Sequence, residues 1–285
     1  MIILLFNDVL CVYVCVCVCD RIESDVDEPA VQRVCANKNS YECIVPCTKP
    51  SLFYALCIPT TTTTTPIDRS IDCGSIMVVH VSVGSKPSPR AQRDTIERGR
   101  RRRIRGFEGF NVDAKDVGKS KNFRAFAKEE TTKKRYAIDE TKTLVGTKGK
   151  EDYDKAKRAL QSWKHFQLGW SEVDANTSVR KGQGVCVLIR PFPFVWVQNP
   201  LEITHVSEEK DKFSFAHTTL PGHLLAGEEK FTVEKEENNE VYFKVETFSK
   251  PDHVLTKVTY PAVRALQKIF GVQAGLEMKK AVRNM

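Results

Sequence analysis

Several chemical signatures are missing from the second half of this sequence. Residues 137–285 contain no apolar run near the roughly 20 residues that a membrane-spanning helix needs. They also lack a nucleophile–base–acid series, a glycine-rich phosphate loop and a set of three closely spaced metal ligands. Ser171 and Ser249 have no activating neighbours, and Cys186 lies in an apolar strand. These absences exclude a polytopic membrane protein, and they mean that no motif in this half indicates a particular reaction.

What is present is unevenly distributed along the 285 residues. Nine of the ten cysteines lie at or before Cys73, whereas all three tryptophans follow residue 160. The net charge of +8 belongs mostly to residues 61–136, which carry +9, while residues 137–285 carry +2. The charge of the second half therefore gives no reason to expect nucleic-acid binding there. We predict an extension over residues 1–135 and an α+β domain over residues 136–285.

The extension is expected to be low in complexity, cysteine-rich at first, and largely disordered. Met1–Cys19 is nearly all apolar but is interrupted by Asp8, so a cleaved signal, an anchor and no targeting role all stay open. Alternating Val and Cys, followed by Thr60–Thr65, suggests an over-extended gene model or a recently acquired segment. Cys43 and Cys47 have no second well-spaced pair, so we predict no zinc site.

An arginine run occupies Arg98–Arg105. Such a run is typical of a nuclear address, a phosphate-binding patch or an anchor on acidic lipid. No aromatic side chains are interleaved with it, so a solvated, disordered linker is the favoured interpretation. Residues 107–135 are charged and weakly periodic, and we also expect them to be linker.

Two helices are predicted in the second half. One begins after Gly149, and its apolar stripe recurs at helical spacing. The other begins at Tyr260-Pro261 and runs to the C-terminus, with Gly271 and Gly275 expected to bend or interrupt it. The stripes are Tyr153, Ala156, Leu160 and Trp163 in the first helix, and Val263, Leu266, Phe270 and Ala274 in the second.

Strands are predicted between these helices. They cover 141–145, 185–189, 194–197, 201–206 and 213–220, followed by a hairpin over 231–245. Placing the hairpin's apolar residues on one face requires Phe231 opposite Val245. That register predicts a three-residue loop with Asn239 in a left-handed conformation, and it turns Glu229 toward the apolar face and Glu228 away from it.

The order of elements predicts an α+β fold. At least five antiparallel-type strands follow one helix and precede a long C-terminal helix. A curved antiparallel sheet that packs against this helix would cover its apolar face, and the two together can enclose an apolar cavity.

Several short motifs make this half resemble uncharacterised protein family 0548, over about residues 136–285. They are Leu144-Val145-Gly146, Ala159-Leu160-Gln161-Ser162-Trp163-Lys164-His165-Phe166, Gly169-Trp170, Thr219-Leu220-Pro221-Gly222-His223, Gly227-Glu228-Glu229-Lys230-Phe231 and Phe248-Ser249-Lys250-Pro251. The stretch from Gly222 to Glu229 is similar to the plant branch. Where the family often has an aromatic residue and a glycine, this chain has His217-Thr218.

The resemblance implies a helix-grip, lipid-transfer-like fold and no agreed enzymatic activity. Some plant members resemble plastid outer-envelope proteins proposed to form pores. The implied location is the plastid outer envelope or the cytoplasm, and the nucleus if Arg98–Arg105 is used.

The candidate ligand-binding residues are His223, Glu229, His217, Trp196 and Phe231. His223 and Glu229 lie on either side of a turn, where they can fix the turn, orient a ligand or act as an acid–base pair. His217 shares a strand face with phenylalanines, so a satisfied core histidine is its alternative role. Core packing is likewise the alternative for Trp196.

We therefore expect non-catalytic binding of an apolar or amphipathic small ligand between the sheet and the helix, with no cofactor or metal. The ligand class would include lipids. An envelope-associated channel or docking protein and a small-molecule enzyme using His223 and Glu229 are the alternatives. Peripheral membrane contact through the terminal helix or the arginine run is also retained.

Overall fold

The computed structural model describes residues 80–104, 109–252, 256–257 and 259–285, together with four short strands before them. The chain divides into two compact units, Met1–Asp72 and Cys73–Met285. In the first unit, β1 (Val14–Cys17) pairs with β4 (Phe53–Leu56), and β2 (Arg33–Asn37) pairs with β3 (Tyr41–Val45). The predictions of targeting and of the roles of the early cysteines, and that of disorder before residue 80, fall outside the described residues and side chains.

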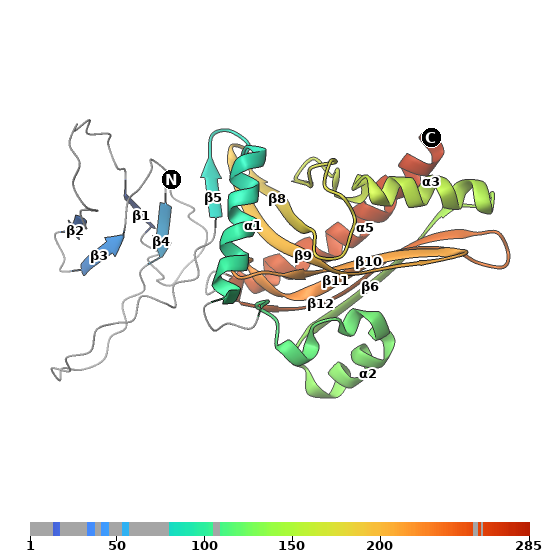
Figure 1. Cartoon of the computed structure of the whole chain (residues 1–285), viewed down its shortest axis with the longest axis horizontal. Helices are drawn as coiled ribbons and strands as arrows, with labels where there is room; N and C mark the ends of the chain where they lie inside the picture. Colours follow the sequence, from blue (N-terminus) through green and yellow to red (C-terminus); the bar gives the residue numbers. More distant parts are fainter. Residues whose placement is uncertain are drawn as a thin grey trace. The chain divides into compact units, whose positions relative to one another are not determined.

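The second unit contains an antiparallel sheet and the helices that cover it (Figure 1). Its strands are β5 (His80–Val83), β6 (Ala137–Gly146), β7 (Ser171–Glu172), β8 (Gly184–Phe192), β9 (Val195–Glu209), β10 (Lys212–Thr219), β11 (Leu225–Lys235) and β12 (Val241–Pro251). Its helices are α1 (Pro89–Ile104), α2 (Phe123–Lys133), α3 (Lys150–Gln161) and α5 (Tyr260–Asn284), with short 3-10 turns η2 (Ala114–Asp116), η3 (Lys119–Asn122) and η4 (Lys164–Phe166).

The sheet confirms the predicted fold class. Its order is β6-β12-β11-β10-β9-β8-β7, and β5 adds to β9. The sheet curls around its concave face, where α3 and α5 pack, and α1 and α2 lie on the other side (Figure 1). This curved sheet with its long C-terminal helix is the helix-grip arrangement.

The β11–β12 hairpin has the predicted register. Phe231 pairs with Val245, and Val233 pairs with Phe243. The Glu236 amide donates to the Glu240 carbonyl across the loop at 2.8 Å. Asn239 has φ of 66°, the left-handed conformation that the loop length requires. Alternation of apolar side chains was sufficient here because one face of both strands is buried.

β9 differs from the sequence prediction because it joins two expected strands into one. It runs through Pro200, which has no N–H to donate to the ladder but whose carbonyl accepts from the Leu220 amide at 3.0 Å. The irregularity expected at Pro191 and Pro193 is present as a register shift between Ile189 and Phe192.

α5 is continuous from Tyr260 to Asn284, so Gly271 and Gly275 do not interrupt it. These glycines let α5 approach β6 closely. A Cβ at Gly275 would lie 2.2 Å from Thr143 Oγ1, and one at Gly271 would lie 2.8 Å from Thr141 Cγ2. Such distances are far inside van der Waals contact, so only glycine fits against these threonines.

The outer face of the sheet corrects the linker prediction for residues 107–135. From residue 109 onward this segment folds into η2, η3 and α2 and packs on the sheet. Val112 and Phe126 of this segment, with Tyr136 directly after it, form one buried apolar cluster. The cluster also contains two outward-facing strand residues, Ala226 and Phe248. Without this cover, that apolar part of the sheet would face water.

The arginine run is likewise not a disordered linker, because residues up to Ile104 belong to α1. Ile96 of this helix packs against Leu188 and Leu220 on the outer face of the sheet. Arg100 binds Glu202, with Nε 2.9 Å from Oε2, and donates to the Gly182 carbonyl at 2.6 Å. At least one arginine of the run is therefore used in holding α1 to the sheet.

Candidate functional site

The side chains on the concave face change from aromatic to polar along β10 and β11. Phe213, Phe215 and His217 alternate on one strand, and Phe231 and Glu229 alternate on the next. The phenylalanines are buried among side chains of α3, η4 and α5. The wall that faces the helices thus begins as aromatic and ends with an imidazole beside a carboxylate.

His217 and Glu229 are paired across the two strands. They are direct partners in the β10–β11 register, and His217 Nε2 lies 3.0 Å from Glu229 Oε2. The His217 side chain is 1% exposed and that of Glu229 is 21% exposed. His217 thus orients the carboxylate from the buried side, while Glu229 is the member that is partly exposed to solvent.

The surroundings of His217 are aromatic. Its ring is nearly parallel to that of Trp163, with centroids 6.5 Å apart, and perpendicular to Phe231 at 5.3 Å. Its second nitrogen, Nδ1, is buried and has no hydrogen-bond partner among the described residues. Aromatic packing therefore fixes the plane of the imidazole, and the bond to Glu229 uses its Nε2 side.

His165 is a second buried imidazole in the same wall. It is fully buried, its ring lies 4.4 Å from that of Phe231, and neither nitrogen has a partner in the described part of the chain. Burial, and then the nearby His217, lower the pKa of His165 well below its usual range. The sequence assigned it a structural role at a helix end and gave no sign of its unsatisfied nitrogens, which depend on the tertiary packing.

His223 does not pair with Glu229, contrary to the acid–base pair considered from the sequence. Its Nδ1 accepts from the Leu225 amide at 2.9 Å, so the side chain closes the turn before β11. Desolvation lowers the pKa of His223 to about 3 and keeps the ring neutral. The turn-fixing role considered from the sequence is the one that this geometry supports.

The structure separates Trp196 from the other candidates. Trp196 packs with Leu188 and Leu220 on the outer face, beneath α1, and Arg190 lies 5.4 Å from its ring. Phe231, in contrast, lies in the concave wall beside His217. Of the five sequence candidates, the structure brings together His217, Glu229 and Phe231.

Glu228 is a buried carboxylate that the sequence placed on the solvent side. It does face away from the concave wall, but the segment 109–135 covers it and leaves it 2% exposed. It accepts from the amides of Gly118 and Ser120, at 2.8 and 3.0 Å, and from Thr218 Oγ1 at 2.7 Å. All of its partners belong to the chain, so its role is to hold the covering segment in place.

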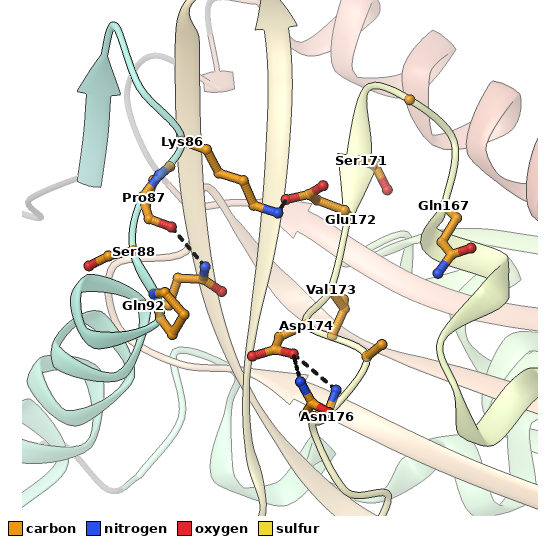
Figure 2. A pocket seen from close by; sticks show the side chains of 13 residues that line it. Lys86, Pro87, Ser88, Gln92, Gln167, Ser171, Glu172, Val173, Asp174 and Asn176 are labelled. Atoms are coloured by element: carbon orange, nitrogen blue, oxygen red, sulfur yellow. Dashed lines mark hydrogen bonds and ion pairs between the residues drawn. The ribbon is translucent and has the colours of Figure 1, made fainter.

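A separate cleft of about 720 Å³ lies between the chain that precedes α1 and the loop around β7. Figure 2 shows Lys86 and Glu172 reaching toward each other across it, where they form an ion pair. Asp174 accepts from the backbone amide and side-chain nitrogen of Asn176, at 2.9 and 3.1 Å. Lys86 and Glu172 are thus engaged with each other and Asp174 with Asn176, and His217 and Glu229 are not part of the lining of this cleft.

The described residues contain neither a metal site nor a membrane-spanning helix. No group of three His, Cys, Asp or Glu side chains there is arranged to hold a metal ion. Among the same residues, no helix is long and apolar enough to cross a membrane.

Sequence comparison relates the chain to proteins without an assigned activity. A family described as "Domain of unknown function (DUF1990)" matches residues 115–276. A UPF0548 protein of Arabidopsis thaliana is 41% identical over 169 residues, which span 56% of this chain and 82% of the relative. A UPF0548 protein of Dictyostelium discoideum is 32% identical over 160 residues, 52% of this chain and 73% of the relative.

Two solved structures are distantly similar to the chain. A hypothetical protein of Helicobacter pylori has a TM-score of 0.37 at 16% identity, covering 51% of this chain and 85% of that one. Human STARD10 has a TM-score of 0.36 at 10% identity, covering 58% of this chain and 80% of that one.

Proposed function

The chain belongs to the UPF0548 (DUF1990) family, and from that starting point we propose that it binds a small amphipathic ligand at the concave face of its sheet. The polar group of the ligand would hydrogen-bond to Glu229, and its apolar part would replace side chains of α3, η4 or α5 that now cover the aromatic wall around Phe231. The observation that supports this most is a partly exposed carboxylate whose only described partner is a buried imidazole.

The free oxygen of Glu229 suggests the chemistry of the polar group. His217 binds Oε2, and Oε1 takes no hydrogen bond from any described residue. A carboxylate oxygen accepts hydrogen bonds and cannot donate when ionised. The ligand should therefore carry a donor, such as a hydroxyl or an amine. A ligand carboxylate would meet like charge in a poorly hydrated place, which is unfavourable.

The unsatisfied imidazole nitrogens give independent support. A buried polar atom without a partner costs about 1–3 kcal/mol, and His165 and His217 together have three such nitrogens. A bound molecule with polar atoms, or water carried with it, would recover part of this cost. The proposed site therefore includes His165 as well as Glu229 and His217.

Native mass spectrometry of the full chain tests this function directly. A bound small molecule should appear in the native spectrum and be released and identified under denaturing conditions. In the Glu229→Gln variant the bound fraction should fall, because the amide presents a neutral group to the donor. Glu246→Gln is the matched control, since Glu246 pairs with Lys230 on the outer face at 2.9 Å. Equal ligand retention in both variants would exclude Glu229 as the anchor.

A catalytic role is the second candidate, and the His217–Glu229 pair is the feature that favours it. A carboxylate held by an imidazole can serve as a general base, with Glu229 as the member that contacts substrate. This role requires turnover of the released molecule or its close analogues, with loss in Glu229→Gln at unchanged binding. Binding without any conversion would leave the non-catalytic role.

A further inference from the structure

The solvent face of α5 carries apolar side chains that nothing in the described structure covers. They are Leu266, Ile269, Val272 and Leu276, between 43% and 57% exposed. Their spacing of three and four residues aligns them on one side of the helix over about 15 Å. The buried residues of α5, which include Phe270, Ala274 and Met278, lie on the opposite side. α5 is therefore apolar on two faces, of which one packs against the sheet.

Charges beside this stripe have one sign. α5 contains five basic residues and one acidic residue. Its exposed charged side chains are all cations, Lys268, Lys279, Lys280 and Arg283. The acidic residue, Glu277, is ion-paired with Lys280 at 3.4 Å. Arg264, the remaining cation, is held at the inner face by Asp139 at 2.5 Å.

We propose that this face of α5 docks on a membrane surface that contains anionic lipids. An amphipathic helix that presents an apolar stripe flanked by Lys and Arg lies in the interface, with the stripe at the acyl boundary and the cations among the lipid phosphates. Each such cation near an anionic leaflet is favourable. The proposal concerns the outer face of α5 and does not depend on a ligand at the concave face.

A second copy of the chain is the competing occupant, and the charges disfavour it. Packing two α5 stripes together would bring two strongly basic helices side by side, and like charges across an interface are repulsive. An anionic surface instead complements the same side chains. The anchoring of α5 to β6 through Gly271 and Gly275 also keeps the stripe fixed and outward, so docking needs no unfolding.

Vesicle co-sedimentation of the full chain is the test. Vesicles of phosphatidylcholine alone are compared with vesicles of equal parts phosphatidylcholine and phosphatidylglycerol. The wild-type chain should partition onto the anionic vesicles far more than onto the neutral ones. Ile269→Gln/Val272→Gln/Leu276→Gln should weaken that partition on the order of 100-fold, because three partly buried apolar contacts with the acyl boundary are lost.

Two further variants make the test specific. Lys268→Gln/Lys279→Gln keeps the apolar stripe and should weaken binding about fivefold per lysine. Phe192→Gln removes an apolar side chain of similar exposure (53%) on the β8–β9 turn and should leave binding unchanged. Both act on exposed side chains, so the fold is retained.

Three results would contradict membrane docking by this face of α5. Wild-type-like binding by the triple variant, or equal binding to both vesicle types, would overturn the proposal. So would a dimer in sedimentation velocity that the triple variant converts to a monomer, which would assign the stripe to a second copy of the chain.

Discussion

Replacing Glu228 with alanine should release the segment 109–135 from the sheet. Glu228 Oε2 accepts from the Gly118 amide at 2.8 Å and from Thr218 Oγ1 at 2.7 Å, and Oε1 accepts from the Ser120 amide at 3.0 Å. Hydrogen bonds to a charged acceptor contribute about 1.5–3 kcal/mol each, and a buried donor left without a partner costs about 1–3 kcal/mol.

The expected loss is smaller than the sum of these three bonds. Ser120 is fully buried, so its amide would be left without a partner, whereas Gly118 is half-buried and its amide can bind water. We therefore expect Glu228→Ala to lower the free energy of unfolding by about 3–4 kcal/mol. Glu228→Gln keeps an acceptor oxygen and should lose about half of that.

Urea unfolding combined with amide hydrogen exchange measures both the size and the place of the effect. Exchange should accelerate first in residues 118–136, while the β11–β12 hairpin stays protected. Glu234→Ala is the control: this strand residue forms surface ion pairs with Lys244 and Lys212 and should lose no more than about 1 kcal/mol. A loss below about 1 kcal/mol for Glu228→Ala, with unchanged exchange at 118–122, would refute the role given to this carboxylate.

Further predictions concern α5 and the turn before β11. Gly275→Ala should destabilise the protein by about 1–3 kcal/mol in thermal unfolding despite the better helix propensity of alanine, because the added Cβ meets Thr143. Combining it with Thr143→Ala should recover part of the loss, and simple additivity would contradict the close contact. The pKa of His223, lowered to about 3 in the folded state, means that the unfolded chain binds a proton there first as the pH falls. Stability should therefore decrease from about pH 6.5 toward pH 3, and His223→Gln should remove up to about 1.4 kcal/mol per pH unit of that slope; an unchanged slope would contradict a desolvated, neutral imidazole at this turn.

Much of the central sheet could be predicted from the sequence, because buried strands impose a strict alternation. The pairing of Phe231 with Val245 followed from placing apolar side chains on one face. The loop length then fixed Asn239 in its left-handed conformation. The register and the loop conformation of a hairpin depend on residues that are close together in the sequence, so the sequence is sufficient to predict them.

The cover on the outer face could not be predicted in the same way. In the segment 109–135, apolar residues such as Val112 and Phe126 stand among charges without a regular period. Their burial depends on an apolar patch around Phe248, which lies far away in the sequence. The same applies to Arg100, whose partner Glu202 is on β9.

The candidate site was predicted only in part, because it too depends on contacts between residues that are far apart in the sequence. The hairpin register correctly turned Glu229 toward the concave face, but its partner was sought in the turn rather than on the neighbouring strand. The β10–β11 register places His217 opposite Glu229, and the sequence pattern alone does not fix the register of that pair of strands. The unsatisfied nitrogens of His165 emerge only when η4 packs into the aromatic wall.

Calorimetric titration of the full chain with octanol and with octanoate, each at a concentration where it is dissolved as monomers, tests the central proposal most directly. The two ligands share an apolar chain and differ in whether the polar group donates to Glu229 or repels it. We predict that the wild-type chain prefers the alcohol by at least tenfold and that Glu229→Gln removes this preference while Glu246→Gln keeps it. Equal affinity for both ligands in the wild-type chain, or a preference that survives in Glu229→Gln, would contradict ligand anchoring at this carboxylate.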